Sequence, residues 1–175
     1  MRLFIATSFP KDVLRGLNDR VAPLKSRLPA ASWVKPETQH LTFAFLGEQP
    51  ESVLERIDID GGAAFEATLH GCGMFGRRVA WVGVEPRDAF IALGRRVRDA
   101  LKTAAVTFDD KPFKPHLTLA RVRAPWPAAA VRTFESALRD YRSAPFAVAS
   151  VILYASRLSP AGAIHTPLRT FGLSA

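Results

Sequence analysis

The spacing of apolar residues along the chain follows two patterns, and each pattern predicts a different kind of element. Apolar residues recur every three or four positions over residues 11–28 and 87–104, which predicts two amphipathic helices, the first of them bent or ended early by Pro23. Shorter helical patterns cover residues 51–57 and 127–141. Short runs rich in Phe, Leu, Ile, Val and Thr predict strands, and these runs cover residues 2–9, 40–46, 65–69, 79–84, 116–122, 146–155 and 163–171.

The order of the predicted elements repeats once along the chain. A strand, a helix, a loop and a second strand that begins His-Leu-Thr start at residue 2, and the same order starts again at residue 79. Two copies of one unit explain this order most economically. No linker separates the copies, so we expect residues 1–175 to form a single two-lobed domain. The predicted fold is α+β, with two pseudo-symmetric lobes, each an antiparallel sheet backed by helices, and a groove between them.

The second strand of each copy carries the candidate chemistry. These strands read His-Leu-Thr-Phe-Ala from His40 and His-Leu-Thr-Leu-Ala from His116. Side chains alternate along a strand, so His40 and Thr42 share one face, as do His116 and Thr118, while the residues between them face the core. If a pseudo-twofold axis relates the lobes, these two faces meet across the groove.

Two imidazoles and two hydroxyls around one groove suit the hydrolysis of a phosphodiester. In-line displacement needs a base on the attacking water and an acid on the leaving oxygen, and imidazole titrates near neutrality in both roles. The hydroxyls can donate to the non-bridging oxygens. None of the usual metal-ligand spacings is present, so we expect neither a metal nor a cofactor. The alternative is a duplicated pair of structural strand histidines, but the matching flanks favour catalysis.

Composition adds a compartment and a class of partner to this picture. The 24 Lys and Arg residues outnumber 16 Asp and Glu, giving a formal charge of +8 that suits a polyanion such as a nucleic acid. The single cysteine, Cys72, cannot form an internal disulfide, which fits a reducing compartment. We find neither a secretory signal nor a membrane-spanning run, and we therefore predict a cytoplasmic protein without a membrane partner.

Motifs along nearly the whole chain carry a resemblance to a known family. They include Trp-Val before His40, Phe-Leu-Gly-Glu at 45–48, Trp-Val-Gly at 81–83, Pro-Phe-Lys-Pro before His116 and Thr-Pro-Leu at 166–168. With the two His-Leu-Thr strands, they resemble the two-histidine (2H) phosphoesterases. Within that superfamily they are most similar to the RNA 2',3'-cyclic phosphodiesterases of the LigT/ThpR type, also called 2'-5' RNA ligases.

The resemblance implies a reaction and assigns roles to residues. It implies hydrolysis of an RNA-terminal 2',3'-cyclic phosphate to a 2'-phosphate without metal or cofactor, and a weak reverse reaction that forms a 2'-5' linkage. It implies that His40 and His116 are the acid–base pair and that Thr42, Thr118 and Arg121 bind phosphate. We assign His116 as the base and His40 as the acid, although the sequence leaves this order open. Arg121 falls on the wrong face of a regular strand, so we expect a bulge or a strand end there.

Several expectations concern partners and other residues. The predicted partner is an RNA with a cyclic-phosphate end, such as a tRNA fragment, bound by a monomer. The alternatives are an RNA- or nucleotide-binding module without turnover, and a phosphodiesterase for another cyclic phosphate or a 2'-5' oligonucleotide. We interpret His165 as a structural or groove-rim residue and His70 as a turn or core histidine. Trp33, Phe9 and Phe113 fit core packing better than base stacking.

Overall fold

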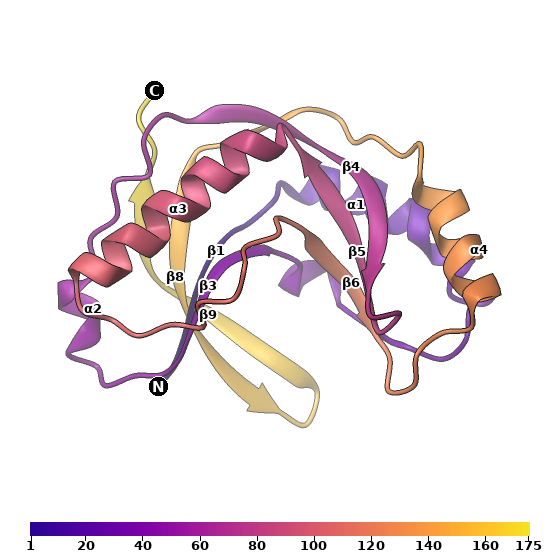
Figure 1. Ribbon diagram of the computed structural model, residues 1–175, viewed down its shortest axis with the longest axis horizontal. Helices are drawn as coiled ribbons and strands as arrows, with labels where there is room; N and C mark the ends of the chain where they lie inside the picture. The colour runs from indigo at the N-terminus through magenta and orange to yellow at the C-terminus, as the bar shows by residue number, and fades with distance from the viewer.

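The computed structural model describes residues 1–175 as nine strands in two antiparallel sheets with four α-helices (Figure 1). The first sheet has the order β3-β1-β8-β9 and contains β1 (Arg2–Thr7), β3 (Leu41–Glu48), β8 (Ser150–Ser159) and β9 (Gly162–Gly172). The second has the order β2-β6-β5-β4-β7 and contains β2 (Ser32–Trp33), β4 (Phe65–Phe75), β5 (Val79–Glu85), β6 (Leu117–Arg121) and β7 (Phe146–Val148). The predicted α+β class with two antiparallel sheets is confirmed.

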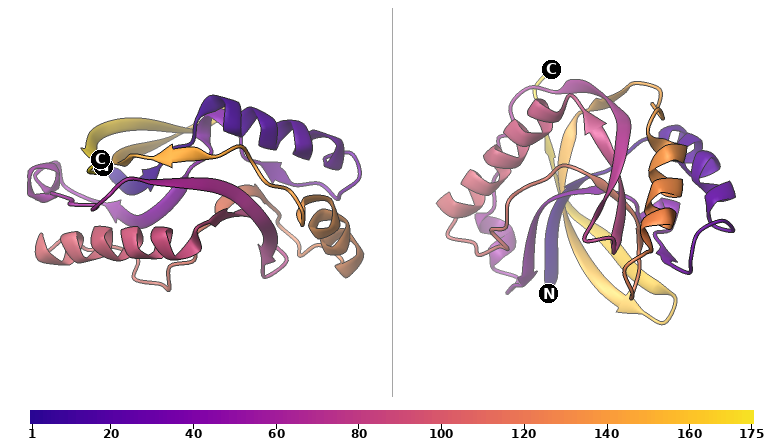
Figure 2. Two further views of the ribbon diagram at one scale, coloured as in Figure 1. Left: turned by 90° about the horizontal axis from the view of Figure 1, so that it is seen from above. Right: turned by 45° about the vertical axis from the view of Figure 1, so that its right-hand side comes forward.

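The helices cover the outer faces of the two sheets. They are α1 (Lys11–Val21), α2 (Val53–Arg56), α3 (Arg87–Thr103) and α4 (Ala128–Leu138), with 3₁₀ turns η1 (Ala22–Leu24) and η2 (Pro36–Thr38). Figure 2 shows α1 and α3 on opposite sides of the molecule, with strands of both sheets between them. None of the helices is long and apolar enough to span a lipid bilayer.

The two copies of the repeated unit exchange strands. In each copy the first strand pairs antiparallel with the His-Leu-Thr strand, β1 with β3 and β5 with β6. The next long strand then crosses to the other sheet: β4 pairs with β5, and β8 pairs with β1. The sheet that contains β1 therefore holds the strands nearest both ends of the chain. Neither sheet is built from one copy alone.

Three predicted elements differ clearly in the structure, and one strand was not predicted. The helix predicted over 11–28 is α1 followed by η1, because Pro23 has no N–H to continue the helix. The strand predicted over 146–155 is two strands, β7 and β8, that belong to different sheets. The strand predicted over 65–69 continues to Phe75, so His70 lies in β4 and not in a turn. The two-residue β2, which pairs with the end of β6, was not predicted.

One apolar core lies beneath both sheets and sets which face of each His-Leu-Thr strand is buried. It contains 37 buried residues from every α-helix and every long strand. Leu41 and Leu117 are fully buried in it, and the residues after each threonine, Phe43 and Leu119, are 1% exposed. Phe9 is also buried, edge-on to Phe146, which confirms core packing for this residue.

Candidate active site

The two sheets bring the His-Leu-Thr strands together at their seam. His40 stands directly before β3 and His116 directly before β6, and these two strands contact each other across the seam. Thr42 and Thr118 are half-buried, like both histidines, while their strand neighbours are buried. The predicted alternation therefore holds in both copies, with a polar face on one side and the core on the other.

The two histidine rings are held by the same local hydrogen bond. Nδ1 of His40 lies 2.7 Å from the carbonyl oxygen of Thr38, and Nδ1 of His116 lies 2.6 Å from that of Lys114. A carbonyl oxygen only accepts, so each Nδ1 carries the proton and donates it. In the neutral ring this leaves a lone pair on each Nε2. Both copies thus present the same nitrogen for chemistry.

Arg121 reaches the histidine face because β6 contains a bulge. In the pairing of β5 with β6, Trp81 faces Thr118 and the next residue back, Ala80, faces Ala120, so Leu119 is extra. An extra residue reverses the alternation of the residues after it, and β6 also ends at Arg121. Both conditions expected for this arginine are therefore present.

The same irregularity occurs in the other copy. Ile5 faces Ala44 and Ala6 faces Thr42, so Phe43 is the extra residue in β3. The residue that corresponds to Arg121 by position is Phe45, whose side chain is 53% exposed. The sequence motif does not reveal either bulge, because it records the order of residues and not their register with the neighbouring strand.

Burial and nearby charges hold both imidazoles neutral. The pKa of His40 is lowered to about 4, mainly because the ring is buried. The hydrogen bond to Thr38 raises this pKa, and the charges of His165, Arg121 and His116 lower it further. Burial likewise lowers the pKa of His116, against its hydrogen bond to Lys114, and the Arg121 charge lowers it further. Charge effects fall with distance. The charge of Arg121 acts on both rings, so this arginine lies near each of them.

Aromatic residues that sequence reasoning missed surround each ring. The His40 ring centroid is 4.9 Å from that of Phe4 and 5.1 Å from that of His165, with the two imidazoles at 80°. The His116 ring is 4.9 Å and edge-on to Phe75, and 6.4 Å from Trp81. The sequence could have pointed to Phe4 and Trp81 as ring neighbours, because they lie on β1 and β5, the strands predicted to begin each copy. His165 is half-buried and lies directly beside His40.

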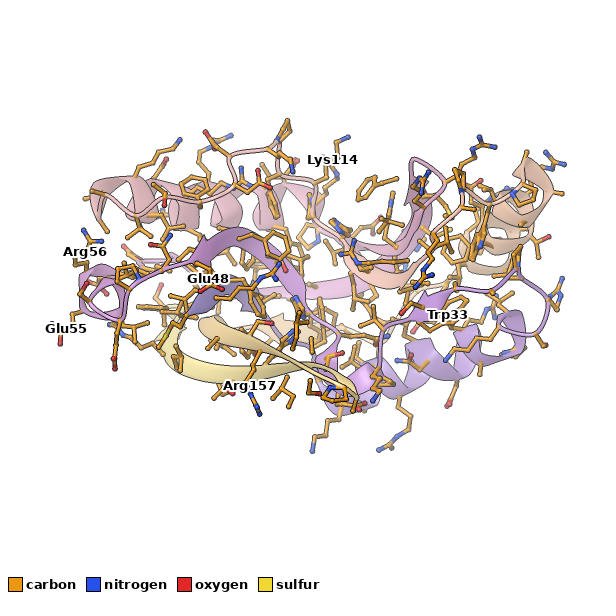
Figure 3. All side chains as sticks on the ribbon, turned by 90° about the horizontal axis from the view of Figure 1, so that it is seen from below. Trp33, Glu48, Glu55, Arg56, Lys114 and Arg157 are labelled. Carbon is orange, nitrogen blue, oxygen red and sulfur yellow. The ribbon has the colours of Figure 1, made fainter.

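Three lysines precede the two His-Leu-Thr strands, and two of them have partners within the protein. The Lys35 ammonium donates to the Ala161 carbonyl, and Lys111 pairs with Asp109 at 3.0 Å. Lys114 differs, since its ammonium lies 5.6 Å from the centre of the Phe75 ring beside His116. Figure 3 shows Lys114 on the opposite side of the molecule from Arg157 of the β8–β9 hairpin.

Two further aromatic residues complete this comparison. Phe113 packs on Phe43 and beneath the Arg98 guanidinium, which confirms core packing. Trp33 packs against Trp126 at 6.5 Å and under the Lys25 ammonium.

A pocket of about 330 Å³ opens beside His116. Its wall includes the aromatic pair Phe75 and Trp81 and the ionisable residues His70 and Glu85. A larger hollow of about 480 Å³, between Arg27 and α4, is lined by neither His40 nor His116. The structure holds no group of three or more His, Cys, Asp or Glu side chains placed to bind a metal ion.

Comparison with known proteins identifies the family to which this fold and this pair of histidine strands belong. The chain belongs to the 2'-5' RNA ligase superfamily, whose family model matches residues 19–159.

Relatives with a recorded activity are similar over almost the full length. An RNA 2',3'-cyclic phosphodiesterase of Thermotoga maritima is 33% identical over 178 residues, covering 96% of this chain and 93% of the relative. A crystal structure of a Thermus thermophilus protein, TT0787, superposes with a TM-score of 0.75 at 30% identity, covering 98% of this chain and 97% of that one. Escherichia coli LigT complexed with 3'-AMP superposes with a TM-score of 0.74 at 26% identity, covering 99% and 98%.

Proposed function

We propose that this protein hydrolyses the 2',3'-cyclic phosphate at an RNA end to a 2'-phosphomonoester by acid–base catalysis with His40 and His116. The observation that carries the proposal is the matched pair of imidazoles, each with Nδ1–H fixed on a backbone carbonyl and Nε2 free. The full-length relatives named RNA 2',3'-cyclic phosphodiesterases support the same substrate. The charge of +8 favours a polyanionic partner.

The proposed reaction is an in-line displacement at phosphorus. One Nε2 accepts a proton from the attacking water while the other imidazolium donates a proton to the departing O3', so the P–O3' bond breaks as the new P–O bond forms. Thr42 and Thr118 donate to the non-bridging oxygens, and the Arg121 guanidinium balances the charge that gathers on them. The same displacement with an RNA 5'-hydroxyl in place of water would join two ends weakly, forming a 2'-5' linkage as the P–O3' bond breaks.

Either histidine can be the base, with the other as the acid. From the sequence we assigned His116 as base and His40 as acid. The pKa of His40, about 4, favours the reverse order in the free protein, because a ring that is neutral at pH 7 is ready to accept a proton. The bound phosphodiester anion favours the protonated form of whichever ring acts as acid.

The primary test uses a short RNA that ends in a 2',3'-cyclic phosphate. We expect the 2'-phosphate as product and the same rate in EDTA. The single variants His40→Ala and His116→Ala should each lower kcat by about 10²- to 10⁴-fold, the usual worth of a general acid or base. Thr42→Val and Thr118→Val should also slow turnover, and exposed Thr103→Val is the matched control. If the protein binds the RNA but never hydrolyses it, the protein is a binding module and the proposal is wrong. A strict need for added metal would also contradict the proposal.

The pH dependence of each single variant decides the order of the roles. In His40→Ala, His116 is the only histidine of the proposed acid–base pair that can still titrate. If His116 is the base, the residual rate falls at low pH, where the ring is protonated; if it is the acid, the rate falls at high pH. His116→Ala should show the opposite limb. Two variants that lose the same limb would contradict paired acid–base roles.

We also propose that residues 1–175 act as one catalytic domain. Strands of each copy complete the sheet of the other, and the two histidines belong to different sheets. A fragment that ends between the copies would lack His116 and would leave β1 without its neighbour β8. The intact chain would act as a monomer on cyclic-phosphate ends such as those of cleaved tRNA.

A further inference from the structure

The pocket beside His116 has a composition that suits a planar, polar ligand. Its volume of about 330 Å³ is at the lower end of the range for small-molecule sites, and it mixes aromatic with ionisable side chains. Its lining includes Trp81, Gly83 and Glu85 from β5, His70 from β4, and Lys114 and His116 from the loop before β6.

The pocket follows one face of β5 away from the histidine. Trp81 pairs with Thr118 and shares its face; by strand alternation Gly83 and Glu85 continue that face. Gly83 lies between them without a side chain, and a Cβ there would be 2.6 Å from the His70 carbonyl oxygen. At about 3.3 Å per residue, Glu85 is about 7 Å along the strand from the level of Gly83. Val82 pairs with Leu117, so Gly83 is level with His116, and a nucleoside whose phosphate lies at His116 can extend its base along the strand toward Glu85.

Glu85 is fixed as a hydrogen-bond acceptor at the far end of this face. Its Oε2 accepts a hydrogen bond of 2.8 Å from Arg142, which also donates to Thr68, and its Oε1 lies 3.8 Å from Nε2 of His70. The hydrogen bond from Arg142 is the main cause that lowers the pKa of Glu85, so the group is a carboxylate at neutral pH.

We propose that this pocket binds the base of the nucleotide that carries the cyclic phosphate and that Glu85 selects guanine. The proposal rests on the proposed function, which places the phosphate at His116 and Thr118. Guanine is the base whose Watson–Crick edge presents two adjacent N–H donors, N1–H and N2–H, to a carboxylate. Adenine and cytosine offer one amino group each, and the N3–H of uracil stands between two carbonyl oxygens that the carboxylate repels.

Charge and shape favour a base over a second phosphate in this pocket. Arg87 and Lys114 stand on its wall and attract an anionic nucleotide, but the carboxylate of Glu85 would repel a phosphate placed against it. The aromatic rings of Phe75 and Trp81 give the pocket an apolar side that a base can contact and a phosphate cannot use.

The test compares the four nucleoside 2',3'-cyclic phosphates as substrates. We expect kcat/KM for the guanosine compound to exceed that for the uridine compound by about tenfold or more, the effect of hydrogen bonds to a charged acceptor. Glu85→Gln should remove most of this preference, because it removes both the charged acceptor for guanine and the repulsion of the uracil carbonyl oxygens. Glu66→Gln, an exposed residue of the same sheet away from the pocket, is the matched control.

The outcomes separate this proposal from the one on which it rests. Equal kcat/KM for all four substrates, or a guanosine preference that Glu85→Gln leaves intact, would overturn the base pocket while the cyclic phosphodiesterase stands. A variant that loses activity on all four substrates equally would show that Glu85 supports the fold and would also overturn the base assignment. If none of the four substrates and no RNA end is hydrolysed by the unaltered protein, the proposed function itself fails.

Discussion

Acid should destabilise this protein through His40, by an amount that depends on the burial of its ring. The pKa of His40 falls from 6.5 to about 4 in the folded protein. Between these values the unfolded chain binds a proton that the folded chain does not, so stability rises with pH across this window and is lost as pH falls. The loss relative to pH 7 is about 1.2 kcal/mol at pH 5.5 and about 3 kcal/mol at pH 4.

The variant His40→Asn isolates this contribution. The asparagine amide can still donate to the Thr38 carbonyl, as Nδ1 does now, but it does not titrate. Urea unfolding at pH 7, 5.5 and 4 gives the free energy of unfolding for both proteins. Other groups titrate equally in the two, so the difference between their pH profiles reports His40. We expect the unaltered protein to lose about 3 kcal/mol more than the variant between pH 7 and pH 4. Parallel profiles would refute the burial of this ring.

Three further predictions test packing and the Glu85 carboxylate. Leu117→Ala should lower the free energy of unfolding by about 2–5 kcal/mol in urea, because the side chain is fully buried; a loss below about 1 kcal/mol would contradict this packing. Gly94→Ala should lower the melting temperature despite the better helix propensity of alanine, because the new Cβ would be 2.6 Å from the Phe113 ring; a higher melting temperature would mean that the ring moves freely. Arg142→Ala should raise the pKa of Glu85 toward its ordinary value, measured by carbon NMR titration, and an unchanged pKa would exclude the ion pair in solution.

The sequence was sufficient to predict the elements that carry local signals. The apolar spacing of α1 and α3 can be recognised from residues close together in the sequence, and so can the repeated His-Leu-Thr strands. These elements lie where they were expected. Local patterns alone do not predict the exchange of β4 and β8 between the copies, because strand pairing depends on contacts far apart in the chain. The local pattern also did not separate β7 from β8, because a run of apolar residues does not show where the chain passes from one sheet to the other.

The site shows the same division between local and long-range information. The shared faces of His40 with Thr42 and of His116 with Thr118 come from alternation along a strand, which needs only the sequence of that strand. The neighbours of the rings do not: Phe75 and His165 lie on strands whose register with the histidines is set by distant pairing. Their positions are visible only in the folded chain.

A duplicated motif can perform acid–base catalysis only if its two copies become different, since the reaction needs one protonated and one neutral ring. The tripeptides, their hydrogen bonds and the bulges after Thr42 and Thr118 are alike in this protein. The difference begins with the residue that follows each bulge at the same position, which is Arg121 in one copy and Phe45 in the other. It continues with the side chains that pack on each ring, because His165 adds a third imidazole beside His40 alone. The asymmetry that separates an acid from a base therefore lies in the residues around the motif, and replacing them should shift the pH profile while both motifs stay intact.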